Sequence, residues 1–252
     1  MIYCFSGTGN SRYVARCLGQ ALDQKITNID AASLLRPERF HCADEVTVWV
    51  FPVHSWGLPK VVGRFMRDMP AIAGRHYMVC TCGDDIGLAH KQWRKLVERY
   101  HGSACGAYSV QMPNTYVLLP GFDVDSDEVE REKLGKCKSR IDYVASRIAG
   151  GYTGDDVVKG GLPWLKSRVI YPLFMAFMTS PRPFKVDRRR CVGCGRCVAR
   201  CPMFNVHQDK AKRPMWGDNC AFCMACYHAC PSHAVAYGRR TKKKGQYNCP
   251  LR

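Results

Sequence analysis

The chain has no hydrophobic run long enough to cross a lipid bilayer. Its most apolar stretch, residues 169–178, is interrupted by Pro172 and is about half the roughly 20 residues that a spanning helix needs. The N-terminus lacks the regions of a signal peptide, because Met1 leads directly into a short apolar segment and a glycine-rich turn. These absences predict a cytoplasmic protein without a transmembrane segment.

The glycine-rich turn lacks the endings of two common nucleotide loops. It runs from Ser6 to Ser11 as Ser-Gly-Thr-Gly-Asn-Ser and is followed by an amphipathic stretch at residues 12–22. Without a Gly-Lys-Ser/Thr ending it disfavours ATP or GTP, and Arg12 replaces the third glycine that a dinucleotide loop needs. A strand that enters such a turn before a helix can cradle an anion. The loop therefore favours a terminal monophosphate, with a plain strand–turn–helix connection as the alternative.

Five apolar segments alternate with helical patterns over the first 150 residues. The strand candidates are residues 1–5, 26–29, 46–51, 77–81 and 107–110. Helical spacing is found at residues 12–22, 58–69, 88–100 and 129–148. This alternation predicts an α/β domain with a doubly wound, five-stranded parallel sheet, in which ligands lie outside the carboxyl ends of the strands. Two further loops at those ends, residues 52–59 and 81–87, are therefore site candidates.

Cysteine is abundant, with 16 residues in a chain of 252. Eight lie in two runs, residues 191–202 and 220–231, and each run reads Cys-x2-Cys-x2-Cys-x3-Cys-Pro. This spacing builds [4Fe–4S] clusters. A zinc site is the alternative, but zinc needs four ligands and neither a third Cys-x2-Cys step nor a trailing Cys-Pro. The other eight are expected to be free thiols in a reducing compartment: Cys4, Cys17, Cys42, Cys80, Cys82, Cys105, Cys137 and Cys249.

Residues 184–237 resemble a two-cluster bacterial-type ferredoxin, because two full motifs lie at the expected separation. The apolar residues Phe204, Val206, Ala234 and Val235 follow the two runs where that fold has short strands. The resemblance implies that the fourth cysteine of each run binds the other cluster. The implied ligand sets are Cys191, Cys194, Cys197 and Cys230 for one cluster, and Cys220, Cys223, Cys226 and Cys201 for the other.

The first 150 residues look like a flavodoxin, and the whole chain resembles the flavodoxin–ferredoxin fusion proteins found mainly in anaerobic prokaryotes. The resemblance implies a flavodoxin-like FMN-binding domain at residues 1–150 and an apolar linker packed on the domains at residues 151–183. A small α+β 2[4Fe–4S] ferredoxin domain with a basic C-terminal tail would occupy residues 184–252. The implied cofactors are FMN and two [4Fe–4S] clusters.

By the same resemblance, the turn at residues 6–11 holds the FMN phosphate and two later loops flank the isoalloxazine ring. Trp56 is the expected stacking partner, with packing under a loop as the alternative. The 81–87 loop has no aromatic residue for the second flavin face, so that face is open to a substrate or covered by another residue such as Tyr116. The predicted FMN residues are Ser6, Gly7, Thr8, Gly9, Asn10, Ser11, Pro52, Val53, His54, Ser55, Trp56, Gly57, Thr81, Cys82, Gly83, Asp84 and Gly87.

The linker is apolar between its glycine and proline breakers, whereas a flexible linker would be polar. We expect it to pack on the flavodoxin-like domain or in the groove between domains. A membrane-surface helix or a docking site for a partner is the alternative. The side chains expected to be buried are Trp164, Leu165, Ile170, Tyr171, Leu173 and Phe174.

Acidic side chains are scarce, with 21 Asp and Glu against 38 Lys and Arg, for a formal net charge of +17. From Arg182 onward there are 16 Lys and Arg against three Asp. Such basic patches can bind nucleic acid, but nothing in the sequence resembles a nucleic-acid reader. The charge favours an acidic redox partner protein, such as a ferredoxin or a reductase, that is steered electrostatically.

Two functions remain open at this level. The first is electron transfer, with single electrons relayed between a low-potential donor, the two clusters and FMN. The second is a flavoenzyme, a ferredoxin-dependent flavin reductase that reduces a small-molecule acceptor at FMN. The sequence defines no catalytic residue: His54 is a candidate proton donor or a structural loop residue. Cys80 and Cys82 are either a redox dithiol or two buried thiols.

Overall fold

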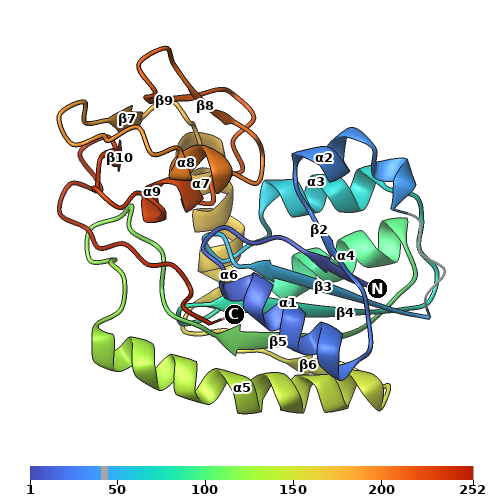
Figure 1. Ribbon diagram of the computed structural model, residues 1–252. Coiled ribbons are helices and arrows are strands. Elements are labelled where there is room, and N and C mark those ends of the chain that lie inside the picture. Colours follow the sequence, from blue (N-terminus) through green and yellow to red (C-terminus); the bar gives the residue numbers. More distant parts are fainter. Residues whose placement is uncertain (41–44, 252) are drawn as a thin grey trace.

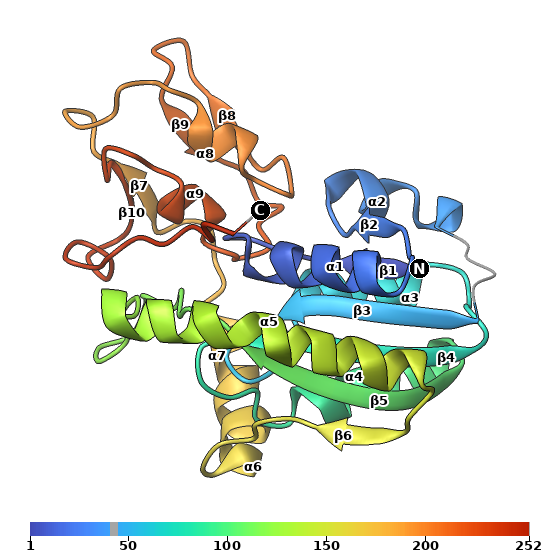
Figure 2. The ribbon, with the colours of Figure 1, turned by 60° about the horizontal axis from the view of Figure 1, so that its bottom comes forward.

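The computed structural model describes residues 1–40 and 45–251 (Figure 1). Cys42, which we expect to be a free thiol, lies outside these residues. The N-terminal part is a layered α/β structure, and the C-terminal part lies against the edge of the sheet to which the strands point (Figures 1 and 2). The two parts are therefore in contact at the edge where the sequence places its candidate loops.

One parallel sheet organises the N-terminal part, with the strand order β2-β1-β3-β4-β5-β6. The first five strands of the chain give the order 2-1-3-4-5, which is the flavodoxin-like arrangement. Most side chains of β1, β3 and β4 are buried, because helices cover both faces. The predicted α/β class and doubly wound parallel sheet are thus confirmed. The strands are β1 (Ile2–Cys4), β2 (Ile26–Asn28), β3 (Val46–Pro52), β4 (Arg75–Cys82), β5 (Ser103–Gln111) and β6 (Gly154–Asp156).

The sixth strand corrects the predicted count of five. β6 pairs in parallel with β5 at the edge of the sheet, within the segment that the sequence analysis treated as linker. Its residues are exposed, and two of them form ion pairs: Asp155 with Arg94 at 2.6 Å and Asp156 with Arg140 at 2.7 Å. Because Gly-Asp-Asp has no apolar residue, hydrophobic periodicity gave no signal for this strand.

Four main helices cover the sheet. α1 (Asn10–Ala21) and α5 (Asp127–Ala149) pack on one face, and α3 (Lys60–Asp68) and α4 (Ala89–Tyr100) pack on the other. Ser126 is the N-cap of α5, and its side chain accepts a hydrogen bond from the Val129 backbone N–H. The first turn of α5 is acidic, which suits a helix N-terminus. A short α2 (Ala31–Leu35) and a 3-10 turn (Pro37–Arg39) precede β3.

The linker forms a continuous helical rod with an irregular centre. α6 (Pro163–Leu165) passes through a π-helical segment (Lys166–Ile170) into α7 (Tyr171–Phe177). The Tyr171 N–H bonds to the Lys166 carbonyl, one residue further back than in an α-helix, next to Pro172, which has no N–H to donate. The expectation of full burial is wrong, because Trp164, Leu165, Ile170 and Leu173 are exposed.

The C-terminal part is a small α+β unit with two antiparallel strand pairs. β7 (Phe184–Val186) pairs with β10 (Val235–Tyr237), and β8 (Val206–Gln208) pairs with β9 (Pro214–Trp216). α8 (Arg196–Ala199) and α9 (Ala225–His228) each lie within one cysteine run. Val206 and Val235 are strand residues as expected, but Phe204 is not: its φ is +48° and it is 61% exposed.

In the part of the chain that the structure describes, there is no helix with the length and apolar character needed to cross a membrane.

Candidate functional site

The glycine-rich turn joins β1 to α1 at the carboxyl edge of the sheet. Gly9 has a φ of +109°, which side-chain-bearing residues rarely adopt. Ser11 Oγ and Thr81 Oγ1 share a 2.7 Å hydrogen bond that ties the turn to the end of β4. Ser6 Oγ is buried and has no hydrogen-bond partner among the described residues. Because an unpaired buried hydroxyl is costly, Ser6 offers a ready hydrogen-bonding group to an anion in the turn.

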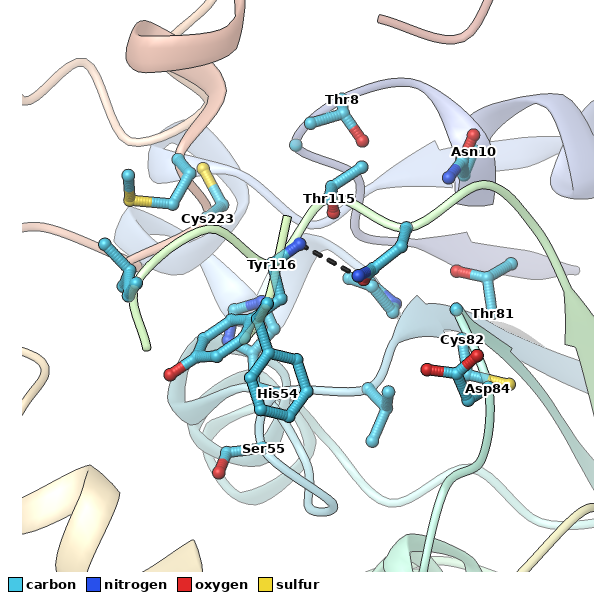
Figure 3. Close-up of a pocket in the computed structure, with 18 of the residues that line it drawn as sticks. Thr8, Asn10, His54, Ser55, Thr81, Cys82, Asp84, Thr115, Tyr116 and Cys223 are labelled. Carbon is cyan, nitrogen blue, oxygen red and sulfur yellow. Dashed lines mark hydrogen bonds between the residues drawn. The ribbon is translucent and has the colours of Figure 1, made fainter. Parts of the chain in front are cut away.

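A cavity lies where the three predicted loops meet (Figure 3). Three predicted residues, Gly9, Gly57 and Gly87, are outside its lining. Gly57 instead allows close packing of the linker, because an added Cβ would meet the Tyr171 ring at 2.3 Å. The predicted residues that do line the cavity are Ser6, Gly7, Thr8, Asn10, Ser11, Pro52, Val53, His54, Ser55, Trp56, Thr81, Cys82, Gly83 and Asp84.

The opposite wall comes mostly from segments that the sequence analysis missed. It contains residues from 113–122 after β5, Phe174 of the linker, and residues 222–224 of the C-terminal part. Tyr116, considered as a cover for the second flavin face, packs edge-on against Phe122 and Phe174. Burial raises the pKa of its hydroxyl to about 12, and this hydroxyl has no hydrogen-bond partner within residues 1–40 and 45–251. Tyr116 is the one residue of this wall that the sequence analysis considered as a flavin contact.

The loop after β3 makes a tight turn in which His54 and Gly57 exchange two backbone hydrogen bonds. Ser55 and Trp56 at its centre have φ values of +47° and +64°, so the turn has the primed type that usually carries Asn or Gly. Trp56 is held from the linker side, since its carbonyl accepts from Ser167 Oγ and Lys166 Nζ lies 5.1 Å from its ring centroid. The structure thus places Trp56 both in the cavity lining and against the linker helix.

His54 does not have the properties of a cationic proton donor. Its ring packs edge-on to Phe5, with centroids 6.1 Å apart, and burial lowers its pKa to about 4. The imidazole is therefore neutral at pH 7. A neutral His54 can still hydrogen-bond a ligand, but a role as an imidazolium acid is disfavoured.

The end of β4 carries two buried thiols, Cys80 and Cys82, and the loop that follows carries two carboxylates, Asp84 and Asp85. Burial, together with Asp85 and Asp84, raises the pKa of Cys82 to about 12, and burial raises that of Cys80 well above its usual value. Both remain thiols at pH 7, which argues against the redox-dithiol interpretation. Asp85 pairs with Lys166 at 2.7 Å, whereas Asp84 is exposed at the cavity rim, with Lys133 Nζ 3.9 Å from its Oδ1. Asp85 thus secures the linker, and Asp84 is left to face solvent.

The cysteines border two small cavities in the C-terminal part, and each cavity groups a set that the resemblance implied. Cys191, Cys194 and Cys197 are joined by Cys230 from the second run. Cys220, Cys223 and Cys226 are joined by Cys201 from the first run. Among the described residues, no three His, Cys, Asp or Glu side chains converge closely enough to hold a single metal ion. Instead, each set of four cysteines lines one of the two small cavities.

Hydrogen-bond donors point at several of these sulfurs. The Asn205 N–H lies 3.4 Å from Cys201 Sγ and the Ala234 N–H lies 3.2 Å from Cys230 Sγ, so the fourth cysteine of each run has a donor four residues later. Trp216 Nε1 lies 3.5 Å from Cys226 Sγ. Such donors stabilise thiolate ligands and tune cluster potentials.

The 4Fe-4S dicluster domain family (Fer4_9) matches residues 190–235. A ferredoxin from Methanothermococcus thermolithotrophicus is 40% identical over 57 residues, which cover 20% of this chain and 88% of that protein. Through this segment the chain belongs to the ferredoxin family. The thiosulfate reductase electron transfer subunit PhsB of Salmonella typhi is 39% identical over 67 residues, 22% of this chain. The match spans 33% of PhsB, about a third of its length.

Solved structures resemble the N-terminal domain only weakly. A flavodoxin from Streptococcus pneumonia TIGR4 is 14% identical, covers 59% of this chain and 96% of its own, and has a TM-score of 0.37. The Trp repressor binding protein from Bacillus subtilis is 14% identical over 58% of this chain and 96% of its own, with a TM-score of 0.40. The strand order is what makes the N-terminal domain flavodoxin-like, and the chain is a fusion of this domain with a ferredoxin domain.

The ferredoxin domain forms part of the cavity at the strand ends. Phe222, Cys223 and Met224 line it next to the glycine-rich turn, and Figure 3 shows both Cys223 and Thr8 in the upper part of the view. The contact is close enough to require a glycine at position 7, because an added Cβ would meet the Cys223 carbonyl oxygen at 2.7 Å. A cysteine of the second set therefore lies directly against the glycine-rich turn.

The C-terminal tail of the ferredoxin domain returns to the same turn. The Cys249 N–H bonds to the Thr8 carbonyl at 2.9 Å, and Tyr247 Oη lies 2.9 Å from Asn10 Oδ1. An added Cβ at Gly9 would meet Cys249 Cβ at 2.9 Å. The contact that requires glycine at position 9 is thus with the tail. The sequence analysis could not find it, because the partner lies 240 positions away.

His228 links the ferredoxin domain, the 113–122 segment and the tail. Its Nε2 lies 3.0 Å from the Thr115 carbonyl, and its Nδ1 accepts from the Tyr247 N–H at 3.1 Å. Because a carbonyl only accepts and an N–H only donates, the ring is neutral with its proton on Nε2. Burial lowers the pKa of His228 to about 4, in agreement with this state.

Proposed function

We propose that the chain relays single electrons between a low-potential donor, two [4Fe–4S] clusters and FMN. The observation that carries this proposal is the placement of Cys223, which belongs to the second cysteine set and also lines the cavity at the strand ends. Each cluster would exchange single electrons, and FMN can exchange one or two. The chain would then connect its two kinds of redox centre without a second protein.

The donor sets fit these groups. Cys191, Cys194, Cys197 and Cys230 would hold one cluster, and Cys201, Cys220, Cys223 and Cys226 the other. For FMN, Ser6 supplies a buried hydroxyl that has no hydrogen-bond partner among the described residues, and the glycine-rich turn lies before the N-terminus of α1. The loops that begin at Pro52 and Thr81 would flank the ring, with Tyr116 and the ferredoxin domain on the opposite side.

An acidic redox partner fits the charge of the surface near Cys220. A groove between the α3–α4 surface and residues 219–221 is lined by Lys60, Arg64, Arg67, Lys95 and Arg99, and no Asp or Glu is among its described lining residues. Arg64 has a carboxylate neighbour in Asp68 at 3.2 Å. A partner with an acidic surface would be attracted to this groove and brought to the cluster beside the flavin cavity.

The alternative function, reduction of a small acceptor at FMN, requires a proton donor. His54 is neutral at pH 7. Tyr116 has a pKa of about 12, so its hydroxyl is protonated at pH 7, and this hydroxyl has no hydrogen-bond partner among the residues described. Tyr116 is therefore the candidate donor if such a reaction exists. Turnover with candidate acceptors that is lost in Tyr116→Phe, with cofactor content unchanged, would favour this alternative.

Cofactor analysis of anaerobically purified protein tests the proposal. We expect about eight iron atoms, about eight acid-labile sulfides and about one FMN per chain. Zinc at two equivalents in place of iron, or FAD in place of FMN, would contradict it. A stepwise reductive titration should then reduce the flavin and the clusters in the same molecules.

A further inference from the structure

The linker exposes an unusual number of large apolar side chains to solvent. Of the 16 large apolar side chains that are exposed among the described residues, eight lie within residues 158–177. Isolated exposed apolar residues are normal, but contiguous ones mark an interaction surface. We call this set the apolar strip: Val158, Leu162, Trp164, Leu165, Val169, Ile170, Leu173 and Phe177.

The opposite face of the same helix is fixed to the flavodoxin-like domain. Ser167 Oγ donates to the Trp56 carbonyl and accepts from the Leu88 N–H, both at 2.7 Å. Tyr171 Oη donates to the Leu58 carbonyl at 2.6 Å. With these bonds in place the helix cannot rotate to bury the apolar strip. Figure 2 shows α6 extending beyond the sheet, at the end of the rod formed with α7.

The charges around the apolar strip are of one sign. Between residues 157 and 186 the charged side chains are Lys and Arg, with no Asp or Glu. Three carboxylates that adjoin this segment are paired: Asp85 with Lys166, Asp155 with Arg94 and Asp156 with Arg140. Lys159 and Arg168 are exposed and form no ion pair among the described residues. The strip is therefore apolar with uncompensated positive charge beside it.

We propose that the apolar strip binds the surface of an anionic lipid bilayer. An amphipathic helix with aromatic and aliphatic residues on one side and basic residues beside them lies in the plane of a membrane interface. Trp164, Leu173 and Phe177 would enter the boundary between headgroups and acyl chains, and Arg168 would contact lipid phosphates. The rod from residue 163 to residue 177 is about 22 Å long, so it lies on a membrane and does not cross one.

The same charges disfavour a second copy of the chain as the occupant. A symmetric pair of apolar strips would bring Lys159 and Arg168 of both copies together without a carboxylate to neutralise them. An anionic bilayer supplies that missing charge, because its headgroups attract basic residues near its surface. This inference does not depend on the proposed electron relay.

Sedimentation of the full-length holoprotein with vesicles tests the proposal. The probes are vesicles of phosphatidylcholine with about one third phosphatidylglycerol, compared with phosphatidylcholine alone. We expect binding to the anionic vesicles, release by salt, and a blue shift of the fluorescence of Trp164. This tryptophan is 64% exposed, so its environment should change most on binding.

The double variant Leu173→Ser/Phe177→Ser should bind anionic vesicles about tenfold or more weakly, because both side chains lose their apolar contact with lipid. Leu35→Ser is the matched control, since Leu35 is 80% exposed but lies on α2. Unchanged iron and flavin content would show that the variants fold. Equal binding of wild type and double variant, or absence of binding by wild type, would overturn the proposal. So would a dimer of the wild type that the double variant dissociates.

Discussion

Two features of the structure require glycine at position 9. Its φ of +109° disfavours any side chain, and an added Cβ would approach Cys249 Cβ to 2.9 Å. We expect Gly9→Ala to strain the turn by about 1 to 3 kcal/mol and to raise the Kd of FMN about tenfold, which equals 1.4 kcal/mol. Flavin titration of the protein freed of FMN measures this change.

Gly154→Ala is the matched control for Gly9→Ala. Gly154 has a φ of +116°, but no atom of the residues that the structure describes lies within 4 Å of a Cβ added there. This control should lower stability without changing the Kd of FMN. If both variants bind FMN like the wild type, the glycine-rich turn is not the phosphate site.

Trp216 is expected to set the potential of one cluster. Its Nε1–H points at Cys226 Sγ from 3.5 Å, and its ring stacks on Phe184 with centroids 5.4 Å apart. Trp216→Phe keeps an aromatic ring but removes the donor. A donor that favours the reduced cluster by about 1 kcal/mol is worth about 40 mV, so the potential should fall by roughly that amount. Redox titration measures the potential, with Trp164→Phe as a control that should leave it unchanged.

At this scale, spacing predicted three members of each cysteine set, because these three lie in one short loop. The exchange of the fourth cysteine between the two runs was implied by the family resemblance. Most of the cavity lining in the three loops was predictable, because ligands lie outside the carboxyl ends of parallel strands. Tyr247 and Cys249 were not, because they reach the turn only through the folded ferredoxin domain. Phe222 and Met224 were missed because their role in the cavity depends on how the two domains meet.

At the scale of elements, each fourth cysteine crosses to the cavity of the other run. Cys201, just after α8, lines the cavity of Cys220, Cys223 and Cys226. Cys201→Ser should therefore damage the cluster of the second run and leave the first, so that about four of about eight irons remain. Iron analysis with electron paramagnetic resonance checks this. Cys17→Ser, outside both cavities, should keep the full iron content. Loss of the Cys191 cluster alone would contradict the crossed arrangement.

His228 on α9 predicts a fall in stability in acid. Its pKa is about 6.5 when unfolded and is lowered by burial to about 4 when folded. The unfolded chain thus binds more protons, so this contribution is complete above pH 6.5 and is lost as the pH falls toward 4. At pH 5 the loss is about 2 kcal/mol. Anaerobic urea unfolding at pH 7 and pH 5 measures it.

His228→Gln cannot titrate and isolates this effect from the other buried histidines, His54 and His76, whose pKa values are also lowered to about 4. We expect the variant to be less stable at pH 7 but to lose less stability between pH 7 and pH 5. An equal loss in both proteins would show that folding does not lower the pKa of His228.

Long, strongly periodic elements were predictable from sequence. The structure contains β1 to β5 and α1, α3, α4 and α5 close to the expected positions, and all of them except the edge strand β2 bury apolar side chains. β6 and α2 were missed, since the first has no apolar residue and the second has five residues. The linker helix shows the limit of composition: apolar residues indicated burial, but one face of the helix carries the apolar strip instead.

At the scale of the whole molecule, the proposed relay depends on the contact between the two domains. Gly7 touches Cys223, the tail covers the glycine-rich turn, and His228 joins both to the 113–122 segment. Transfer between a cluster at Cys223 and FMN would then be intramolecular, and its rate would not depend on the concentration of the protein.

Rapid mixing with a one-electron reductant tests this claim most directly. The reductant is kept in constant excess while the protein is diluted about tenfold, and cluster bleaching and flavin reduction are followed separately. The relay predicts that flavin reduction follows cluster bleaching with a first-order rate that dilution does not change. Flavin reduction that slows in proportion to dilution would contradict the relay and leave two carriers joined by a linker.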